Sequence, residues 1–107
     1  MKYVLGAVAM SIAIILALPY TSFAGEGEWR YSTVDNAWWY SYNNGAWATS
    51  KWQQIKGKWY YFDADGYMMT NSWIGDYYVG KDGAMLESTY TPDGVRVGSN
   101  GKRLSAR

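Results

Sequence analysis

The hydrophobic pattern of this chain has two parts, an unbroken apolar run and then short aromatic segments separated by glycine-containing turns. No charged residue lies between Lys2 and Glu26, and residues 3–18 are almost wholly apolar. Farther along, aromatic runs such as residues 59–62 (Trp-Tyr-Tyr-Phe) are of the kind that favours β-strands. No stretch after Glu26 keeps a helical period. The pattern therefore predicts an all-β domain that follows an N-terminal apolar segment.

The apolar segment is typical of a secretory signal peptide, which forms a helix before it is removed. Pro19 ends the run, and Ser22-Phe23-Ala24 supplies small residues at the two positions that a signal peptidase reads. We therefore expect a signal peptide over residues 1–24, cleaved before Gly25, and a secreted protein. The alternative is an uncleaved anchor, because the uncharged segment approaches the length that spans a bilayer.

Four Asx-Gly dipeptides mark a repeat along the rest of the chain. Their glycines are separated by 21, 17 and 18 residues, and they lie in Asn44-Gly45, Asp65-Gly66, Asp82-Gly83 and Asn100-Gly101. Fixed offsets from each glycine carry similar residues: Tyr40, Tyr61, Tyr78 and Arg96 five before; Trp47, Met68, Met85 and Arg103 two after; Trp52, Trp73 and Tyr90 seven after. Self-similarity at a short fixed period is the signature of a repeat array.

Each repeat is predicted to form one two-stranded hairpin, with the Asx-Gly dipeptide as its turn and, in the central copy, residues 67–70 as its returning strand. A lone hairpin is marginally stable in water, and the sequence contains no cysteine that could form a disulfide. Stacking of hairpins is therefore the expected source of stability. The fold class we expect is a short solenoid of about four stacked hairpins over residues 38–107, after a degenerate N-terminal segment over residues 25–37. The last unit, with Arg96 and Arg103 in place of aromatics, suits a polar cap.

The best-preserved unit resembles the cell-wall-binding repeat, the choline-binding and glucan-binding repeat family of Gram-positive surface proteins. The shared residues are Trp59, Tyr60, Tyr61, Gly66, Met68 and Trp73. The resemblance covers residues 38–104. It implies hairpins stacked into a left-handed solenoid, with ligand sites where aromatic residues of successive hairpins meet.

The resemblance also implies which residues bind a ligand. The stronger set is Trp52, Trp59 and Tyr78 with Met85 as a flanking residue, and the weaker set is Trp29, Trp38 and Tyr61. A third set would begin at Trp73, but Asp76 and Arg96 replace its two other aromatics, so we expect no choline there. The family's usual Gly-Trp is Lys51-Trp52 in this chain, which places an ammonium group next to the stronger set. Aromatic faces suit a quaternary ammonium, and they equally suit the C–H faces of sugars.

Composition excludes several other functions. The formal net charge is +1, and no basic stripe indicates a nucleic-acid partner. The absence of histidine and cysteine removes the usual zinc ligands and nucleophile–histidine pairs. The Asp63-Ala64-Asp65-Gly66 run lacks the first and twelfth carboxylates of a calcium-binding EF-hand loop. We therefore expect no metal, no cofactor and, since a thin hairpin stack offers no deep cleft for a carboxylate pair, no enzyme.

Two functions remain open from the sequence. The first is a secreted, non-catalytic module that attaches at the cell wall or surface to teichoic acid, choline or a glucan. The second is a structural repeat protein whose aromatics form the core and which packs on itself, by self-association, or on another repeat protein.

Overall fold

A computed structural model describes residues 27–104, in which the chain forms eight β-strands and no helix. The strands are β2 (Gly27–Ser32), β3 (Ala37–Tyr42), β4 (Lys51–Ile55), β5 (Lys58–Phe62), β6 (Ser72–Ile74), β7 (Tyr77–Val79), β8 (Thr89–Tyr90) and β9 (Arg96–Val97). The prediction of an all-β domain is confirmed for these residues. The predicted signal peptide lies outside them. Within them, no helix is long and apolar enough to cross a membrane.

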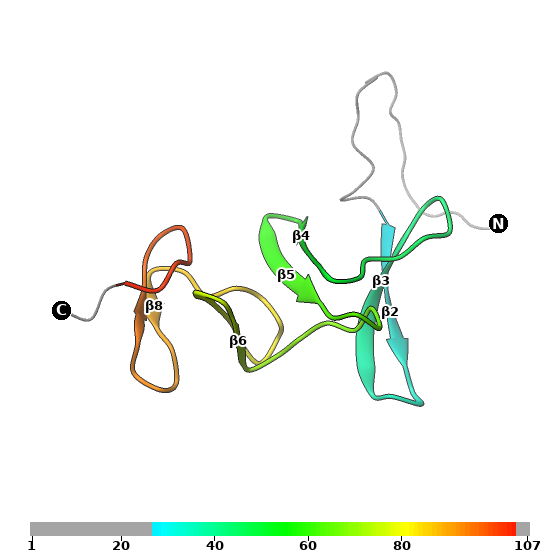
Figure 1. Cartoon of the computed structure of the whole chain (residues 1–107). Helices are drawn as coiled ribbons and strands as arrows, with labels where there is room; N and C mark the ends of the chain where they lie inside the picture. Colours follow the sequence, from blue (N-terminus) through cyan, green and yellow to red (C-terminus); the bar gives the residue numbers. More distant parts are fainter. Residues whose placement is uncertain (1–26, 105–107) are drawn as a thin grey trace, which may run out of the picture.

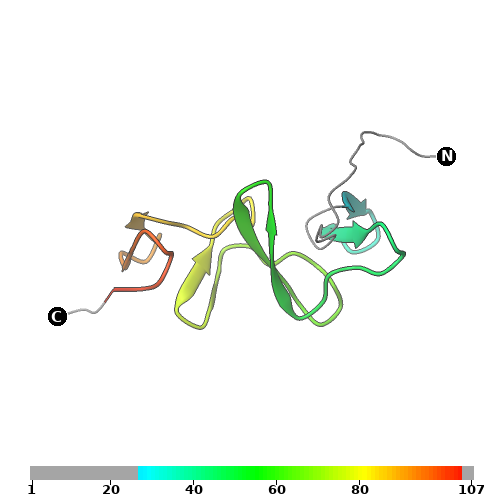
Figure 2. The ribbon, with the colours of Figure 1, turned by 90° about the horizontal axis from the view of Figure 1, so that it is seen from above.

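The strands pair as four separate antiparallel hairpins, β2–β3, β4–β5, β6–β7 and β8–β9. The hairpins follow one another in chain order from one end of the molecule to the other, and each is turned relative to the one before it (Figures 1 and 2). We call each hairpin, together with the Asx-Gly turn that follows it, a repeat unit, numbered one to four.

The Asx-Gly dipeptides are not the hairpin turns, so the prediction was wrong on this point. The strands β4 and β5 are joined by Lys56-Gly57, both at positive φ (51° and 85°), as the twist of a two-residue hairpin turn requires. The Asp65-Gly66 turn follows β5 and folds the chain back, so that Met68 forms a single antiparallel bridge to Phe62. The returning strand expected over residues 67–70 is therefore only this bridge. The sequence did not reveal the true turn, because its first residue is a lysine and not the Asn, Asp or Gly that usually takes positive φ in such a turn.

The same offset recurs in every unit. The isolated bridges are Ser41 to Trp47, Phe62 to Met68, Val79 to Met85 and Val97 to Arg103. In the turns that precede these bridges, Asn44, Asp82 and Asn100 accept a hydrogen bond from the backbone N–H two residues later, which explains why an Asx residue stands before each of these three glycines.

The first hairpin extends into the segment that the sequence indicated to be degenerate. Gly27–Ser32 is a full six-residue strand, paired with β3 along its whole length. Its Trp29 lies directly opposite Tyr40, as Trp52 lies opposite Tyr61 in the second hairpin. The loop between β2 and β3 has four residues, whereas the turns of the second and third hairpins have two. Trp29 therefore lies two residues farther from the Asx-Gly turn of its unit than the two shorter turns would place it.

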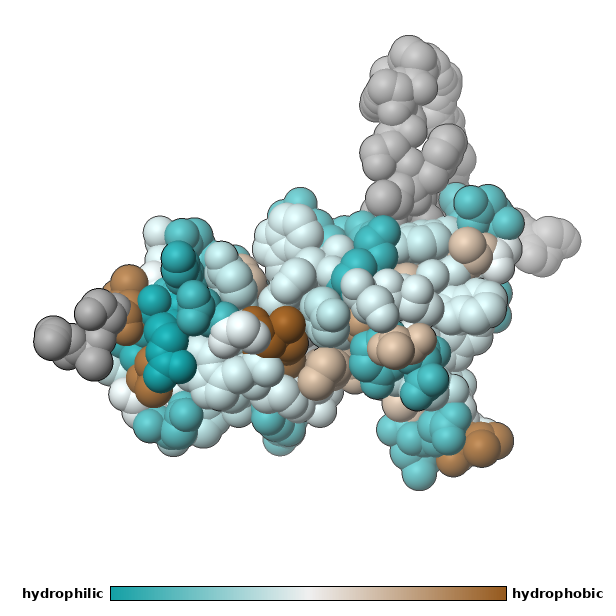
Figure 3. Space-filling view, viewed as in Figure 1, coloured by the Kyte–Doolittle hydropathy of each residue, from teal (hydrophilic) through white to brown (hydrophobic). Residues whose placement is uncertain are grey.

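A cluster of buried hydrophobic residues lies between the first two units. It consists of buried Tyr40, Ala48, Ile55 and Phe62, with Trp29, Tyr42, Tyr60 and Met68 packed against it. In the third and fourth units, fully buried Val79 and Val97 take the position of Phe62 at the end of the second strand. Strongly hydrophilic residues gather over the C-terminal hairpin in the space-filling view, as a polar cap requires (Figure 3).

Candidate functional site

The two tryptophans of the stronger predicted set lie on one face of the second hairpin. Trp52 pairs with Tyr61 and Gln54 pairs with Trp59, and because side chains alternate across a strand, all four project to the same side. The other face of this hairpin carries buried Ile55 and Phe62. Trp59 is 37% exposed and Trp52 is half-buried. The structure therefore brings Trp52 and Trp59 together on a face that still meets solvent.

The ring of Trp52 contacts tyrosines of two hairpins. Its centroid lies 5.3 Å from that of Tyr61 in its own hairpin and 5.8 Å from that of Tyr77 in the next. Both contacts are edge-to-face, at 67° and 76°, the geometry that the ring quadrupoles favour. Tyr77 was not among the residues that the sequence singled out.

The structure places Tyr78 elsewhere. Its ring lies 5.2 Å from that of Trp73, its cross-strand partner in the third hairpin, and it is only 8% exposed. Because Tyr77 and Tyr78 are consecutive in a strand, they project to opposite faces, and only Tyr77 turns towards Trp52. The alternation of side chains could have identified Tyr77 from the sequence. Tyr78 pairs with Trp73 as Tyr61 pairs with Trp52, so the residue before it, Tyr77, projects to the other face of its hairpin.

Met85 joins three successive units. Its backbone N–H donates to the carbonyl oxygen of Trp59 at 2.8 Å. Its side chain extends in the other direction, onto Gly101 of the fourth unit, where its Sδ lies 2.6 Å from the point that a Cβ on that glycine would occupy. Met85 therefore meets Trp59 through its backbone, while its side chain packs on the fourth unit.

Trp29 and Trp38 of the weaker predicted set lie on one face of the first hairpin, as Trp52 and Trp59 do in the second. The rings of Trp29 and Trp38 are 6.3 Å apart and almost perpendicular, and Trp38 is 43% exposed. Trp29 also lies 5.0 Å from Tyr60 of the second hairpin. Tyr61, which the sequence assigned to this set, instead contacts Trp52. Tyr60 thus contacts Trp29 of the preceding hairpin in the same way as Tyr77 contacts Trp52.

Two charged side chains, Lys51 and Asp82, lie near aromatic rings of the first two units. The ammonium of Lys51 lies 5.6 Å from the ring centre of Tyr42, on the face of β4 opposite to Trp52, so it does not stand over the Trp52 ring. Burial, together with the nearby negative charge of Asp82, raises the pKa of the Tyr60 hydroxyl. The hydroxyl, which is protonated at neutral pH at its ordinary pKa of 10.0, therefore loses its proton only at a still higher pH.

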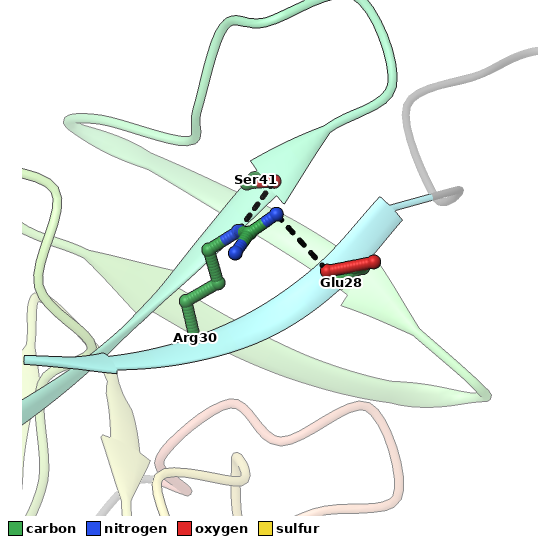
Figure 4. Close-up of polar contacts among 3 residues, drawn as sticks. All are labelled: Glu28, Arg30 and Ser41. Atoms are coloured by element: carbon green, nitrogen blue, oxygen red, sulfur yellow. Dashed lines mark hydrogen bonds and ion pairs between the residues drawn. The ribbon is translucent and has the colours of Figure 1, made fainter. Parts of the chain in front are cut away.

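The opposite face of the first hairpin is polar. Arg30 forms an ion pair with Glu28 at 3.1 Å, and its Nε donates to the Ser41 hydroxyl at 3.3 Å (Figure 4). The guanidinium carbon of Arg30 also lies 5.9 Å from the ring centre of Trp39. The side chains of Arg30 and Glu28 are 52% and 62% exposed, and an exposed pair of this kind contributes at most about 1 kcal/mol to stability. In the described part of the chain, no three carboxylates cluster closely enough to hold a metal ion.

Comparison with known proteins finds the same repeat. The family model described as choline-binding repeat matches residues 46–83 and 67–102, together more than half of the chain. A protein of Streptococcus pneumoniae serotype 4 named as an endo-beta-N-acetylglucosaminidase is 39% identical over 66 residues, which are 62% of this chain and 10% of that protein. The chain thus spans about a tenth of the length of the curated relatives that it matches.

Solved structures share the fold. The modular autolysin LytC from Streptococcus pneumoniae superposes with a TM-score of 0.68 at 35% identity, over 73% of this chain and 19% of that one. A choline-binding domain from Streptococcus pneumoniae gives 0.62 at 29% identity, over 82% of this chain and 100% of that domain. The pneumococcal cell-wall endolysin of phage Cp-1, complexed with choline, gives 0.66 at 31% identity, over 75% of this chain and 25% of the endolysin.

Proposed function

Because the chain belongs to the choline-binding repeat family, we propose that it is a secreted, non-catalytic module that attaches to choline-bearing teichoic acid at a bacterial cell wall. The similar structures include a cell-wall endolysin in complex with choline and a modular autolysin. In the curated relative, nine-tenths of the length lies outside the matched region, so a catalytic name there is compatible with a binding role for the repeats.

The observation that carries the proposal is the recurrence of one aromatic arrangement at two successive inter-hairpin positions. Trp29 meets Tyr60 at 5.0 Å, and Trp52 meets Tyr77 at 5.8 Å. In both units a second tryptophan lies on the same face and remains exposed. Aromatic faces attract a quaternary ammonium, which cannot donate hydrogen bonds, and each desolvated contact contributes about 0.5–2 kcal/mol.

We assign the binding residues from this arrangement. The second inter-hairpin position has Trp52, Trp59 and Tyr77 as its rings and Met85 as its flanking residue, with Tyr78 supporting the neighbouring hairpin. The first position has Trp29, Trp38 and Tyr60, with Tyr61 behind Trp52.

The exposure of Trp38 and Trp59 favours binding over a purely structural role. Neighbouring hairpins would cover both rings if the aromatics served only as core, and the structure leaves 43% and 37% of them accessible. Self-association through these rings would cover them too, and it is the alternative that the experiment must separate.

The test measures binding to purified walls with and without choline on their teichoic acid. The variants Trp59→Ala and Trp38→Ala should each weaken retention, and the double variant should abolish it, while the protein stays folded by circular dichroism. The matched control is Trp39→Ala, because Trp39 lies on the opposite face, beside Arg30. Free choline should elute the bound protein. Retention of the folded double variant would refute the proposal, and elution by soluble glucan but not choline would indicate a saccharide ligand.

A further inference from the structure

The third inter-hairpin position, between the third and fourth units, has the same backbone frame as the first two. The N–H of Met68 donates to the carbonyl of Trp38 at 2.7 Å, and that of Met85 donates to the carbonyl of Trp59 at 2.8 Å. The N–H of Arg103 donates in the same way to the carbonyl of Asp76 at 2.8 Å. The frame is therefore complete at the third position, and Arg103 stands where the second and third units have Met68 and Met85.

The side chains at this position are different. The exposed tryptophan of the first two positions is replaced by Asp76, and the tyrosine that meets the tryptophan from the next hairpin is replaced by Val95. Trp73 is retained, packed edge-to-face on Tyr78 at 5.2 Å. One of the three rings thus remains.

Arg103 covers that remaining ring. The side chains of Met68 and Met85 extend forward onto the glycine of the following unit. Arg103 instead turns back towards the third hairpin, and its guanidinium carbon lies 4.7 Å from the ring centre of Trp73. This is within the range of a favourable cation–π contact. A cation of the chain itself therefore stands over the Trp73 ring.

A carboxylate completes the arrangement. The indole N–H of Trp73 donates to Oδ2 of Asp93 at 3.2 Å, and the Thr91 hydroxyl donates to the other carboxylate oxygen. These hydrogen bonds, with the positive charge of Arg103 nearby, lower the pKa of Asp93. The Trp73 ring thus has the Asp93 carboxylate at its indole N–H and the Arg103 guanidinium over its face.

We propose that the third inter-hairpin position is a latent site for an organic cation, and that Arg103 is its built-in occupant. The inference rests on the proposed function, since it assigns to Arg103 the place that a quaternary ammonium takes at the first two positions. It follows that the protein binds two such ligands, and that removal of the guanidinium opens a third, weaker site at Trp73.

The test follows the indole N–H resonances of the full protein by NMR during titration with tetramethylammonium chloride, against sodium chloride at the same ionic strength. The Trp73 resonance, assigned with Trp73→Phe, should stay unshifted in the wild type and shift saturably in Arg103→Met. Arg103→Lys retains a cation, so its Trp73 resonance should stay unshifted during the titration. The matched control is Arg96→Met, in the same hairpin, because Arg96 lies over Tyr90 rather than Trp73. If Arg103→Met does not fold, Arg103→Gln takes its place.

The same spectra separate this inference from the proposed function. The resonances of Trp52 and Trp59 report the second position, and their failure to shift in any variant would overturn the proposed function and the inference with it. A shift of Trp52 and Trp59 without any response of Trp73 in folded Arg103→Met would overturn the inference alone. An equal response of Trp73 in the wild type and in Arg103→Met would also overturn it, because Arg103 would then not occupy the site.

Discussion

The backbone N–H of Met85 donates to the carbonyl oxygen of Trp59 across 2.8 Å, which ties the third repeat unit to the second. The equivalent bond from Arg103 to Asp76 ties the fourth to the third at the same distance. Because both partners are backbone groups, the bond does not depend on which side chains the two positions carry. The fourth unit can therefore carry Arg96 and Arg103 in place of aromatics and remain in register with the array, whose stability depends on contacts between neighbouring units.

Glycine in the second Asx-Gly turn is required for two reasons. Gly66 has a φ of +94°, and a Cβ there would lie 2.7 Å from Cδ1 of Trp47 in the preceding unit. Gly45 has a similar φ of +92°, but its Cβ would meet nothing within 4 Å. We expect Gly66→Ala to lower the free energy of unfolding by about 1–2 kcal/mol more than Gly45→Ala, on the usual cost of overpacking. Urea denaturation followed by circular dichroism measures the difference, and equal losses would contradict the stacking of Trp47 on this glycine.

Buried valines in the later units should carry the packing that Phe62 provides earlier. Val79 is fully buried and Val34 is 85% exposed. We expect Val79→Ala to lower the free energy of unfolding by about 2 kcal/mol, since each buried methyl or methylene group contributes about 0.8 kcal/mol and a cavity adds to the loss. Val34→Ala is the matched control and should change stability by less than about 0.5 kcal/mol. The measurement is the urea midpoint of each variant, and a loss at Val34 as large as at Val79 would argue against the assigned core.

The C-terminal hairpin should be sensitive to acid. Hydrogen bonds from Thr91 and Trp73, and then the charge of Arg103, hold the pKa of Asp93 below its ordinary value of 3.8. A carboxyl group with a lowered pKa in the folded state stabilises that state above its unfolded pKa, and this contribution is lost as the pH falls through the folded pKa. We expect the Trp73 indole resonance to move below about pH 4 in the wild type and to show no such step in Asp93→Asn. A step of the same size in both proteins would assign the titration to another group.

The N-terminal segment yields a prediction outside the described residues. If the apolar run is a secretory signal, protein recovered from a culture medium should begin at Gly25, because signal peptidase cleaves after small residues such as Ala24. Intact-mass measurement and N-terminal sequencing check this directly. Recovery of a membrane-bound form that retains Met1 would favour the uncleaved anchor.

The sequence predicted the class of fold and the repeat because both depend on local chemistry. Asx-Gly turns need glycine at positive φ, and aromatic runs favour strands, so four β-units follow from composition and spacing. The expectation that Trp52 and Trp59 contribute to one ligand site stays a prediction, while the structure places both residues on one face of the second hairpin. Their sharing of one face follows from their places in β4 and β5.

Two features of the fold could not be predicted from the sequence and became visible only in the three-dimensional structure. The true hairpin turn at Lys56-Gly57 places a lysine at a φ of 51°, a conformation that its residue type does not indicate, so the strands were assigned one segment too late. The choice between Tyr77 and Tyr78 depends on which face of β7 turns towards the second hairpin. That orientation is set by the contact between units, and a repeat period measured from the glycines does not report it.

Each proposed ligand position takes its rings from two successive hairpins, as the contact between Trp52 and Tyr77 illustrates, so the number of such positions is one fewer than the number of hairpins. If one teichoic acid polymer carries several choline groups, the two positions proposed to be open can engage the same polymer. Once the first is filled, the second meets its ligand at a high effective concentration, and the overall avidity exceeds either single affinity. Valence thus grows with array length, and an array of two hairpins would bind only monovalently.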